Sequence, residues 1–195
     1  MGEFELNEKQ RDELQELGNI GAGRASKYLS EIVEHKVDVS VPEVEITTLT
    51  GPETAKQIFD KPAETEVTAV LMPISHPSGV ITFSFTQEDY LKFLKLWGEG
   101  STGDRQNFLE TSKEVSDFYL QAIQTLLGIE INESTPRLIS LDLNALMIHS
   151  SATLSQADSL IINTVLTIKD IECEITLFLE LEDIDEVLEA LEKQI

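Results

Sequence analysis

The two halves of the chain align without a gap at an offset of 94 residues, and this internal repeat constrains the fold more than any other feature. The alignment pairs identical residues at Arg11 and Arg105, Glu16 and Glu110, Ser40 and Ser134, Pro42 and Pro136, Ala63 and Ala157, Ile74 and Ile168, Ile81 and Ile175, Thr82 and Thr176, Glu88 and Glu182, Asp89 and Asp183, and Leu94 and Leu188. Chance similarity of two halves is the alternative, but the matching order of elements favours a repeat. We expect a single domain over residues 1–195, with repeats at about 7–97 and 104–191 joined by a Gly-rich linker at 98–103.

Hydrophobic periodicity gives each half a similar series of elements. Helical spacing predicts a long opening helix that starts after an Asn7 N-cap and ends near Val33. The rest of the first half predicts a strand region over 37–49 broken at Pro42, a short helix at 53–59, a hairpin of 66–74 with 80–85, and a helix at 87–97. The second half predicts a helix at 104–127, a strand with an irregular middle at 129–148, a hairpin of 160–168 with 171–181, and a helix at 183–191.

Strands outnumber the crossover helices that a parallel sheet would need. The pattern therefore predicts an α+β fold with a pseudo-twofold internal repeat, in which a mainly antiparallel sheet carries long helices packed on one face. Neither half could cover its strands alone, so we expect both halves to share one core.

Net charge and cysteine content exclude several classes of binding partner and of structural cross-link. The chain has 14 Lys and Arg against 36 Asp and Glu, a net charge of −22. Such a field repels phosphate backbones and anionic lipid, so we expect no nucleic-acid partner. Cys173 is the only cysteine, which excludes an intrachain disulfide and a multi-thiolate zinc site. No signal peptide or long apolar run stands out, so we expect no membrane insertion and a cytoplasmic protein.

Three glycines interrupt the opening helix at 18, 21 and 23. Each costs about 1 kcal/mol relative to alanine, so together they cost about 2–3 kcal/mol. A sequence keeps such residues where backbone approaches a neighbour closely. The spacings of Gly18 with Ala22 and of Gly21 with Ala25 favour close packing of two helices.

Three polar residues share one face of the same helix. Glu16 and Asn19 are three residues apart, and Asp12 lies one turn earlier. A plain solvated surface is one interpretation of this face. The other is that a carboxylate and a carboxamide on a rigid helix complete another molecule's active site. The carboxylate could anchor on an ammonium group, and the amide could hold one water in line for attack.

These residues resemble a known family signature. The spacing Asp12-x3-Glu16-x2-Asn19, followed by residues 20–41 and then Pro42, is similar to the signature of the CheC/CheX/FliY phosphatases of chemotaxis. The sequence ELGNIGAG at 16–23 is similar to that of the first helix in CheC proteins. The length, the duplicated halves and the lack of an added flagellar-switch domain indicate the CheC type.

The resemblance implies a phosphatase that dephosphorylates the response regulator CheY, in adaptation and signal termination. CheY carries its phosphoryl group on an aspartate with its own Mg²⁺, so we expect no metal or other cofactor bound by this chain. Glu16 would pair with a lysine of CheY, Asn19 would position the hydrolytic water, and Asp12 would be an accessory contact. The deamidase CheD is a further candidate partner.

The repeat places Gln106, Glu110 and Lys113 opposite Asp12, Glu16 and Asn19. Lysine cannot accept a hydrogen bond from water as an amide does, so this second site is degenerate and we expect one working site. Two alternatives stay open. One is a non-catalytic module that sequesters phosphorylated CheY or CheD, and the other is a helix-packing protein in which Glu16 and Asn19 are buried or paired internally.

Overall fold

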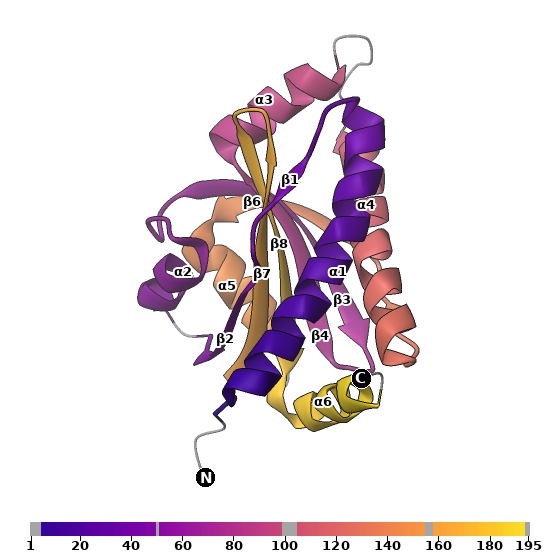
Figure 1. Ribbon diagram of the computed structural model, residues 1–195. Coiled ribbons are helices and arrows are strands. Elements are labelled where there is room, and N and C mark those ends of the chain that lie inside the picture. Colours follow the sequence, from indigo (N-terminus) through magenta and orange to yellow (C-terminus); the bar gives the residue numbers. More distant parts are fainter. Residues whose placement is uncertain (1–4, 50, 99–104, 155–157, 194–195) are drawn as a thin grey trace.

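The computed structural model describes residues 5–49, 51–98, 105–154 and 158–193. Its helices are α1 (Glu8–Val33), α2 (Gly51–Phe59), α3 (Gln87–Gly98), α4 (Arg105–Leu127), α5 (Leu143–Ala152) and α6 (Ile184–Glu192), with a 3-10 turn at Leu181–Asp183. Its strands are β1 (Asp38–Val39), β2 (Glu43–Thr48), β3 (Glu66–Ser75), β4 (Gly79–Thr86), β5 (Asn132–Glu133), β6 (Arg137–Asp142), β7 (Asp158–Ile168) and β8 (Ile171–Glu180). The α+β class is confirmed (Figure 1).

The strands form one antiparallel sheet in the order β1-β7-β8-β4-β3-β5, with β2 also on β7 and β6 also on β3. The central pair, β4 and β8, joins the two halves of the chain. The outer strands are exchanged, because β1 and β2 pair with β7 of the second half while β5 and β6 pair with β3 of the first. Each half therefore completes the sheet of the other.

The two halves pair their strands in the same pattern but not at a constant offset. Arg137 follows Glu43 by 94 residues, whereas Asn163, the partner of Glu43, follows Leu71, the partner of Arg137, by only 92. The difference arises in the hairpins, since four residues separate the last pair of β3 and β4 and two separate that of β7 and β8. The ungapped alignment is therefore wrong over β3 and β7, and the sequence repeat itself stays a prediction.

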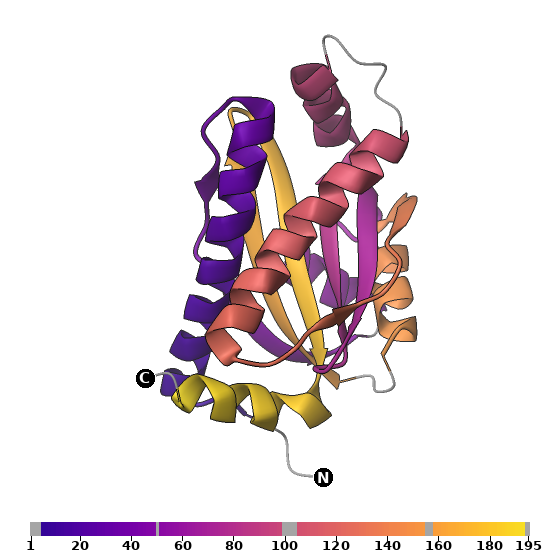
Figure 2. The same ribbon diagram turned by 90° about the vertical axis from the view of Figure 1, so that its right-hand side faces the viewer.

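Helices cover both faces of the sheet (Figures 1 and 2). The long helices α1 and α4 lie side by side on one face, as predicted, and the shorter α2 and α5 cover the opposite face. Strand alternation supplies both cores, because Leu177 of β8 packs under the long helices while Phe178 packs with α2 and α5. The larger core contains residues from both halves, such as Leu17 and Tyr119.

The prediction of a strand over 129–148 is wrong in its second part. The strand β6 ends at Asp142, and α5 begins at Leu143. Asp142 is the N-cap, because its side chain accepts a hydrogen bond from the backbone N–H of Ala145 at 2.7 Å. The leucine, alanine and methionine residues of α5 favour helix, but apolar residues lie on all sides of this helix, so its sequence shows no helical period.

The opening helix begins where the sequence predicts. Asn7 Oδ1 accepts from the backbone N–H of Gln10 at 2.9 Å, and Gln10 Oε1 accepts from the N–H of Asn7 at 3.0 Å. The helix ends at Val33, before Glu34 in the left-handed conformation. Of the predicted linker, residue 98 closes α3 and residues 99–103 lie outside the described residues. Among the described helices, none combines the length and apolar character that a bilayer crossing requires.

Candidate functional site

The three predicted site residues of α1 lie together on its solvent face. Asp12, Glu16 and Asn19 are exposed, whereas Leu17 and Gly18, between them in sequence, are buried against the sheet. Helical spacing of three and four residues produces this separation. The exposure of Glu16 and Asn19 counts against the interpretation in which both are buried for helix packing.

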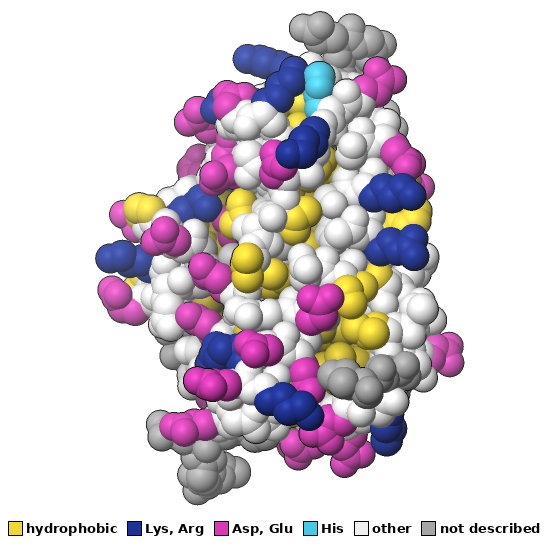
Figure 3. Space-filling view, in the orientation of Figure 1, with side chains coloured by type: hydrophobic (Ala, Val, Ile, Leu, Met, Phe, Trp, Pro, Cys, Tyr) yellow, Lys and Arg dark blue, Asp and Glu magenta, His cyan; other side chains and the backbone are white. Residues whose placement is uncertain are grey.

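A shallow depression of about 280 Å³ runs beside this face. Asp12, Glu16 and Asn19 form one wall of it, together with Gln15, and the segment 39–42 forms the other. Val41 projects from the second wall with 75% of its surface exposed. In Figure 3, which views this side of the molecule, hydrophobic side chains reach the surface on both sides of α1. Pro42 belongs to the sequence signature, whereas Val39, Ser40 and Val41 carry no sequence signal that would place them in this wall.

Backbone hydrogen bonds fix the second wall in place. The N–H of Ser40 donates to the carbonyl of Val165 at 2.9 Å, and Ser40 Oγ accepts from the N–H of Val165 at 3.0 Å. The wall is also tied to α1, because Gln15 Nε2 donates to the carbonyl of Pro42 at 3.2 Å and Arg11 donates to the carbonyl of Val44. The depression is therefore lined by α1, the end of β1 and the β1–β2 connection, and strand β7 holds that connection in place.

Two of the three helix glycines pack closely on a neighbour, but only Gly21 does so on a second helix, as the sequence predicts. A Cβ at Gly21 would lie 2.9 Å from the ring of Tyr119 on α4, so this glycine serves the helix pair. A Cβ at Gly18 would lie 2.6 Å from Ile162 Cγ2 and 3.0 Å from Pro42 Cβ, so Gly18 packs on the sheet and the second wall rather than on a helix. A Cβ at Gly23 would meet no atom within 4 Å.

Asp12, Glu16 and Asn19 are not engaged by neighbouring side chains in the part of the chain that the structure describes. Among the described residues, neither Asp12 nor Glu16 has an ion-pair partner, and the Asn19 amide forms no hydrogen bond with another side chain or wall. An exposed carboxylate can therefore pair with an external ammonium group, and the amide can both donate to and accept from an external water. These three residues alone supply no activated nucleophile.

The corresponding residues of α4 are arranged differently. Gln106 and Glu110 are exposed, and Gln106 Nε2 donates to Glu110 Oε1 at 2.7 Å. Lys113 forms ion pairs with Asp117 and with Glu133 of β5, the latter at 3.6 Å. Partial burial, together with the neighbouring Asp117, raises the pKa of Glu133 to about 7. Where α1 offers an unengaged amide, α4 thus has a cation held by two acidic side chains.

Known proteins match both the motif and the fold. A family model described as CheC-like matches residues 10–46, the segment that contains all three α1 site residues and Pro42. The structure of FliY from Thermotoga maritima matches with a TM-score of 0.75 and 17% identity, over 98% of this chain and 100% of that chain. The FliM middle domain from H. pylori matches with a TM-score of 0.61 and 13% identity, over 95% and 99%.

The chemotaxis protein CheX from Desulfovibrio desulfuricans matches with a TM-score of 0.52 and 17% identity, over 85% of this chain and 99% of that chain. At these identities the structural matches show a shared fold, while the family match covers the helix and strands that build the candidate site. The match over residues 10–46 is thus to the CheC-like family, in agreement with the motif, and the chain shares its fold with FliY and CheX.

Proposed function

We propose that this protein is a phosphatase of the response regulator CheY that accelerates hydrolysis of its aspartyl phosphate. A chemotaxis-related role is supported by the CheC-like family match and by the fold shared with FliY and CheX. The observation that carries the finer proposal is the joint exposure of Asp12, Glu16 and Asn19 on one face of α1, with no engagement by neighbouring described residues.

The proposed mechanism uses positioning rather than covalent catalysis. Glu16 pairs with a lysine of CheY, and Asp12 adds an accessory contact. The Asn19 amide enters the partner's site, where it orients a water whose oxygen attacks phosphorus as the bond to the aspartyl oxygen breaks. The aspartate leaves as a carboxylate and the phosphoryl group leaves as inorganic phosphate. The partner contributes Mg²⁺, which stabilises charge on the phosphoryl oxygens.

We assign the activity to α1 alone. In the second half Lys113 takes the place of the amide. Its ammonium group pairs with Asp117 and Glu133 of the same chain and is therefore not available to a partner protein. Asp117, and Glu133 once it loses its proton near pH 7, would also repel an approaching phosphoryl group. Gln106 and Glu110 therefore belong to a degenerate site.

A decay assay tests the proposal. Phosphorylated CheY is incubated with the wild-type protein, with Asn19→Ala and with Asn107→Ala, an exposed asparagine of α4 that serves as the matched control. We expect the wild type and Asn107→Ala to shorten the lifetime of the phosphoryl group equally, and Asn19→Ala to lose the acceleration while still binding. An unchanged lifetime with Asn19→Ala, relative to the intact protein, would contradict the proposed mechanism.

A second candidate function is a binding module without turnover, which captures phosphorylated CheY or CheD. It is supported by the fold shared with FliM, since one matching FliM structure, from H. pylori, is of a complex with FliG (TM-score 0.59, 12% identity, over 94% of this chain and 100% of that chain). The same assay separates the two functions. A binding module would bind activated CheY or CheD with no acceleration of decay, and Asn19→Ala would change neither property.

A further inference from the structure

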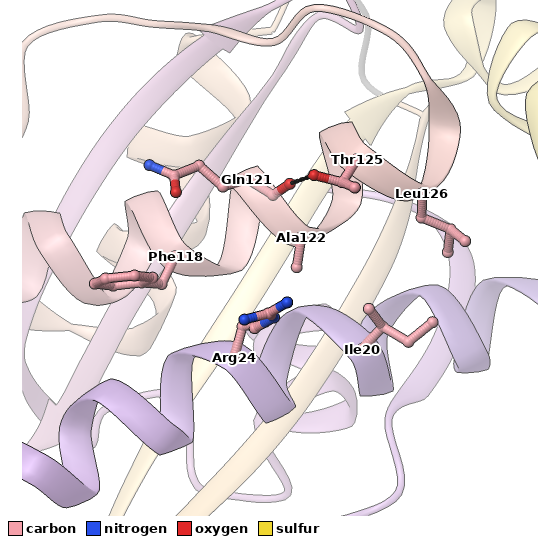
Figure 4. Close-up of a pocket in the computed structure, with 7 residues that line it drawn as sticks. All are labelled: Ile20, Arg24, Phe118, Gln121, Ala122, Thr125 and Leu126. Atoms are coloured by element: carbon pink, nitrogen blue, oxygen red, sulfur yellow. Dashed lines mark hydrogen bonds between the residues drawn. The ribbon is translucent and has the colours of Figure 1, made fainter.

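We propose that the groove between α1 and α4 is a second part of the docking surface, where Arg24 receives a carboxylate of the same CheY partner. This inference rests on the proposed function, because it takes the partner to be the response regulator. The groove has a volume of about 420 Å³ and is larger than the depression beside Asn19. Ile20 and Arg24 line it from α1, and Phe118, Ala122 and Leu126 line it from α4 (Figure 4).

The chemistry of the groove favours a carboxylate. Arg24 is exposed, and its side chain extends from α1 toward Ala122 on the opposite helix (Figure 4). It has no ion-pair partner among the described residues, although the chain carries 36 acidic side chains and only 14 Lys and Arg. The planar guanidinium matches a carboxylate with two parallel hydrogen bonds. Gln121 and Thr125 also line the groove, so the guanidinium shares it with an amide and a hydroxyl but with no carboxylate.

One end of the groove adds a second cation and an exposed ring. Phe118 stacks on Tyr28 with ring centroids 4.6 Å apart, and 37% of Phe118 is exposed. Lys27 is exposed beside this stack, and together with Arg24 and Glu31 it borders an adjoining hollow. No ion pair forms between these cations and Glu31. This end therefore fits a partner segment that combines carboxylates with an apolar contact.

The groove lies within reach of a partner seated on Asn19. Arg24 follows Asn19 by five residues, which is about 7.5 Å along the helix axis and about 140° around it. A stable interface covers about 800 Å² on each partner and so extends farther than this distance. Gly23 lies between the two positions on the exposed side, where a Cβ would meet no atom within 4 Å. Ile20, half-buried on α1, lies between Asn19 and Arg24 around the helix and lines the edge of the groove.

The order of charges along α1 defines the occupant. Asp12 and Glu16 are negative, Asn19 is neutral, and Arg24 and Lys27 are positive. A complementary partner presents a cation opposite Glu16 and a carboxylate opposite Arg24, on the two sides of the group that meets Asn19. A response regulator with the opposite order of charges would be repelled at both ends, so the groove selects among regulators.

The test uses CheY activated with beryllofluoride, a stable analogue of the phosphoryl group, with binding measured by isothermal titration calorimetry. We compare the wild type with Arg24→Glu and Lys27→Glu, and with Lys56→Glu as the control, an exposed lysine of α2 on the opposite face. Each variant changes the charge equally. We expect both α1 variants to raise Kd about tenfold and Lys56→Glu to leave it within about twofold.

Phosphate release by the same variants gives the second readout. We expect Arg24→Glu to raise KM with little change in kcat, in contrast to Asn19→Ala, which lowers kcat. The inference is overturned if Kd and KM of both α1 variants equal those of Lys56→Glu, or if the wild type does not bind activated CheY. If the wild type binds without accelerating decay while Arg24→Glu loses binding, the docking groove stands and the phosphatase proposal fails. Circular dichroism melts confirm that each variant is folded.

Discussion

The helix glycines make opposite stability predictions for the same substitution. Gly18→Ala and Gly23→Ala each remove a glycine from the interior of α1, which by itself raises the free energy of unfolding by about 0.5–1 kcal/mol. At Gly23 nothing opposes this gain, because no atom lies within 4 Å of the new Cβ. We therefore expect Gly23→Ala to stabilise the protein by about 0.5–1 kcal/mol.

At position 18 the same methyl group meets two rigid neighbours. The new Cβ would lie 2.6 Å from Ile162 Cγ2 and 3.0 Å from Pro42 Cβ. Forcing an extra methyl into a packed core costs about 1–3 kcal/mol, which exceeds the gain in helix propensity. We expect Gly18→Ala to lower the free energy of unfolding by about 1 kcal/mol.

Urea-induced unfolding followed by circular dichroism measures both variants, with equal slopes of free energy against denaturant required for the comparison. The two midpoints should move in opposite directions from the wild type. Stabilisation by Gly18→Ala, or destabilisation by Gly23→Ala, would refute the assignment of one glycine to close packing and the other to an open surface.

Two further predictions concern Lys113 of α4 and its acidic neighbour Glu133 of β5. Glu133 has a pKa of about 7 in the folded protein, whereas a free glutamate titrates near 4.5, so the free energy of unfolding falls as pH rises between these values. Glu133→Gln should abolish this fall in stability. Its melting temperature should therefore exceed that of the wild type at pH 8 but not at pH 4.5. Lys113→Asn restores an amide but leaves Asp117 and Glu133 without their cation. Combined with Asn19→Ala it should not accelerate CheY-phosphate decay, and a recovered rate would contradict a single working site.

Sequence reasoning was accurate where the determinants are local. The Asn7 cap, the length of α1 and the β3–β4 hairpin depend on residues within a few positions of one another. The exposed face with Asp12, Glu16 and Asn19 follows from the helical period alone. The helix α5 was missed because an apolar run has no visible period and its signal, Asp142, is a single residue.

The other wall of the candidate site could not be predicted from the sequence. Its position depends on pairing of Asp38 with Thr167 and of Val39 with Leu166, residues far apart in the chain and in different halves. The offset between the halves was also hidden, because a hairpin shortened by two residues changes no hydrophobic pattern within either strand. Long-range register is set by the assembled sheet, which local propensity does not describe.

The exchange of outer strands has a consequence for how the chain is made. As the polypeptide leaves the ribosome, β3 emerges with one edge unpaired. The strand that pairs with this edge, β6, is synthesised about 60 residues later. An uncovered apolar edge invites pairing with other chains. A nascent chain of this acidity repels its own copies. We therefore expect the net charge of −22 to oppose association of nascent chains while this edge of the sheet is uncovered.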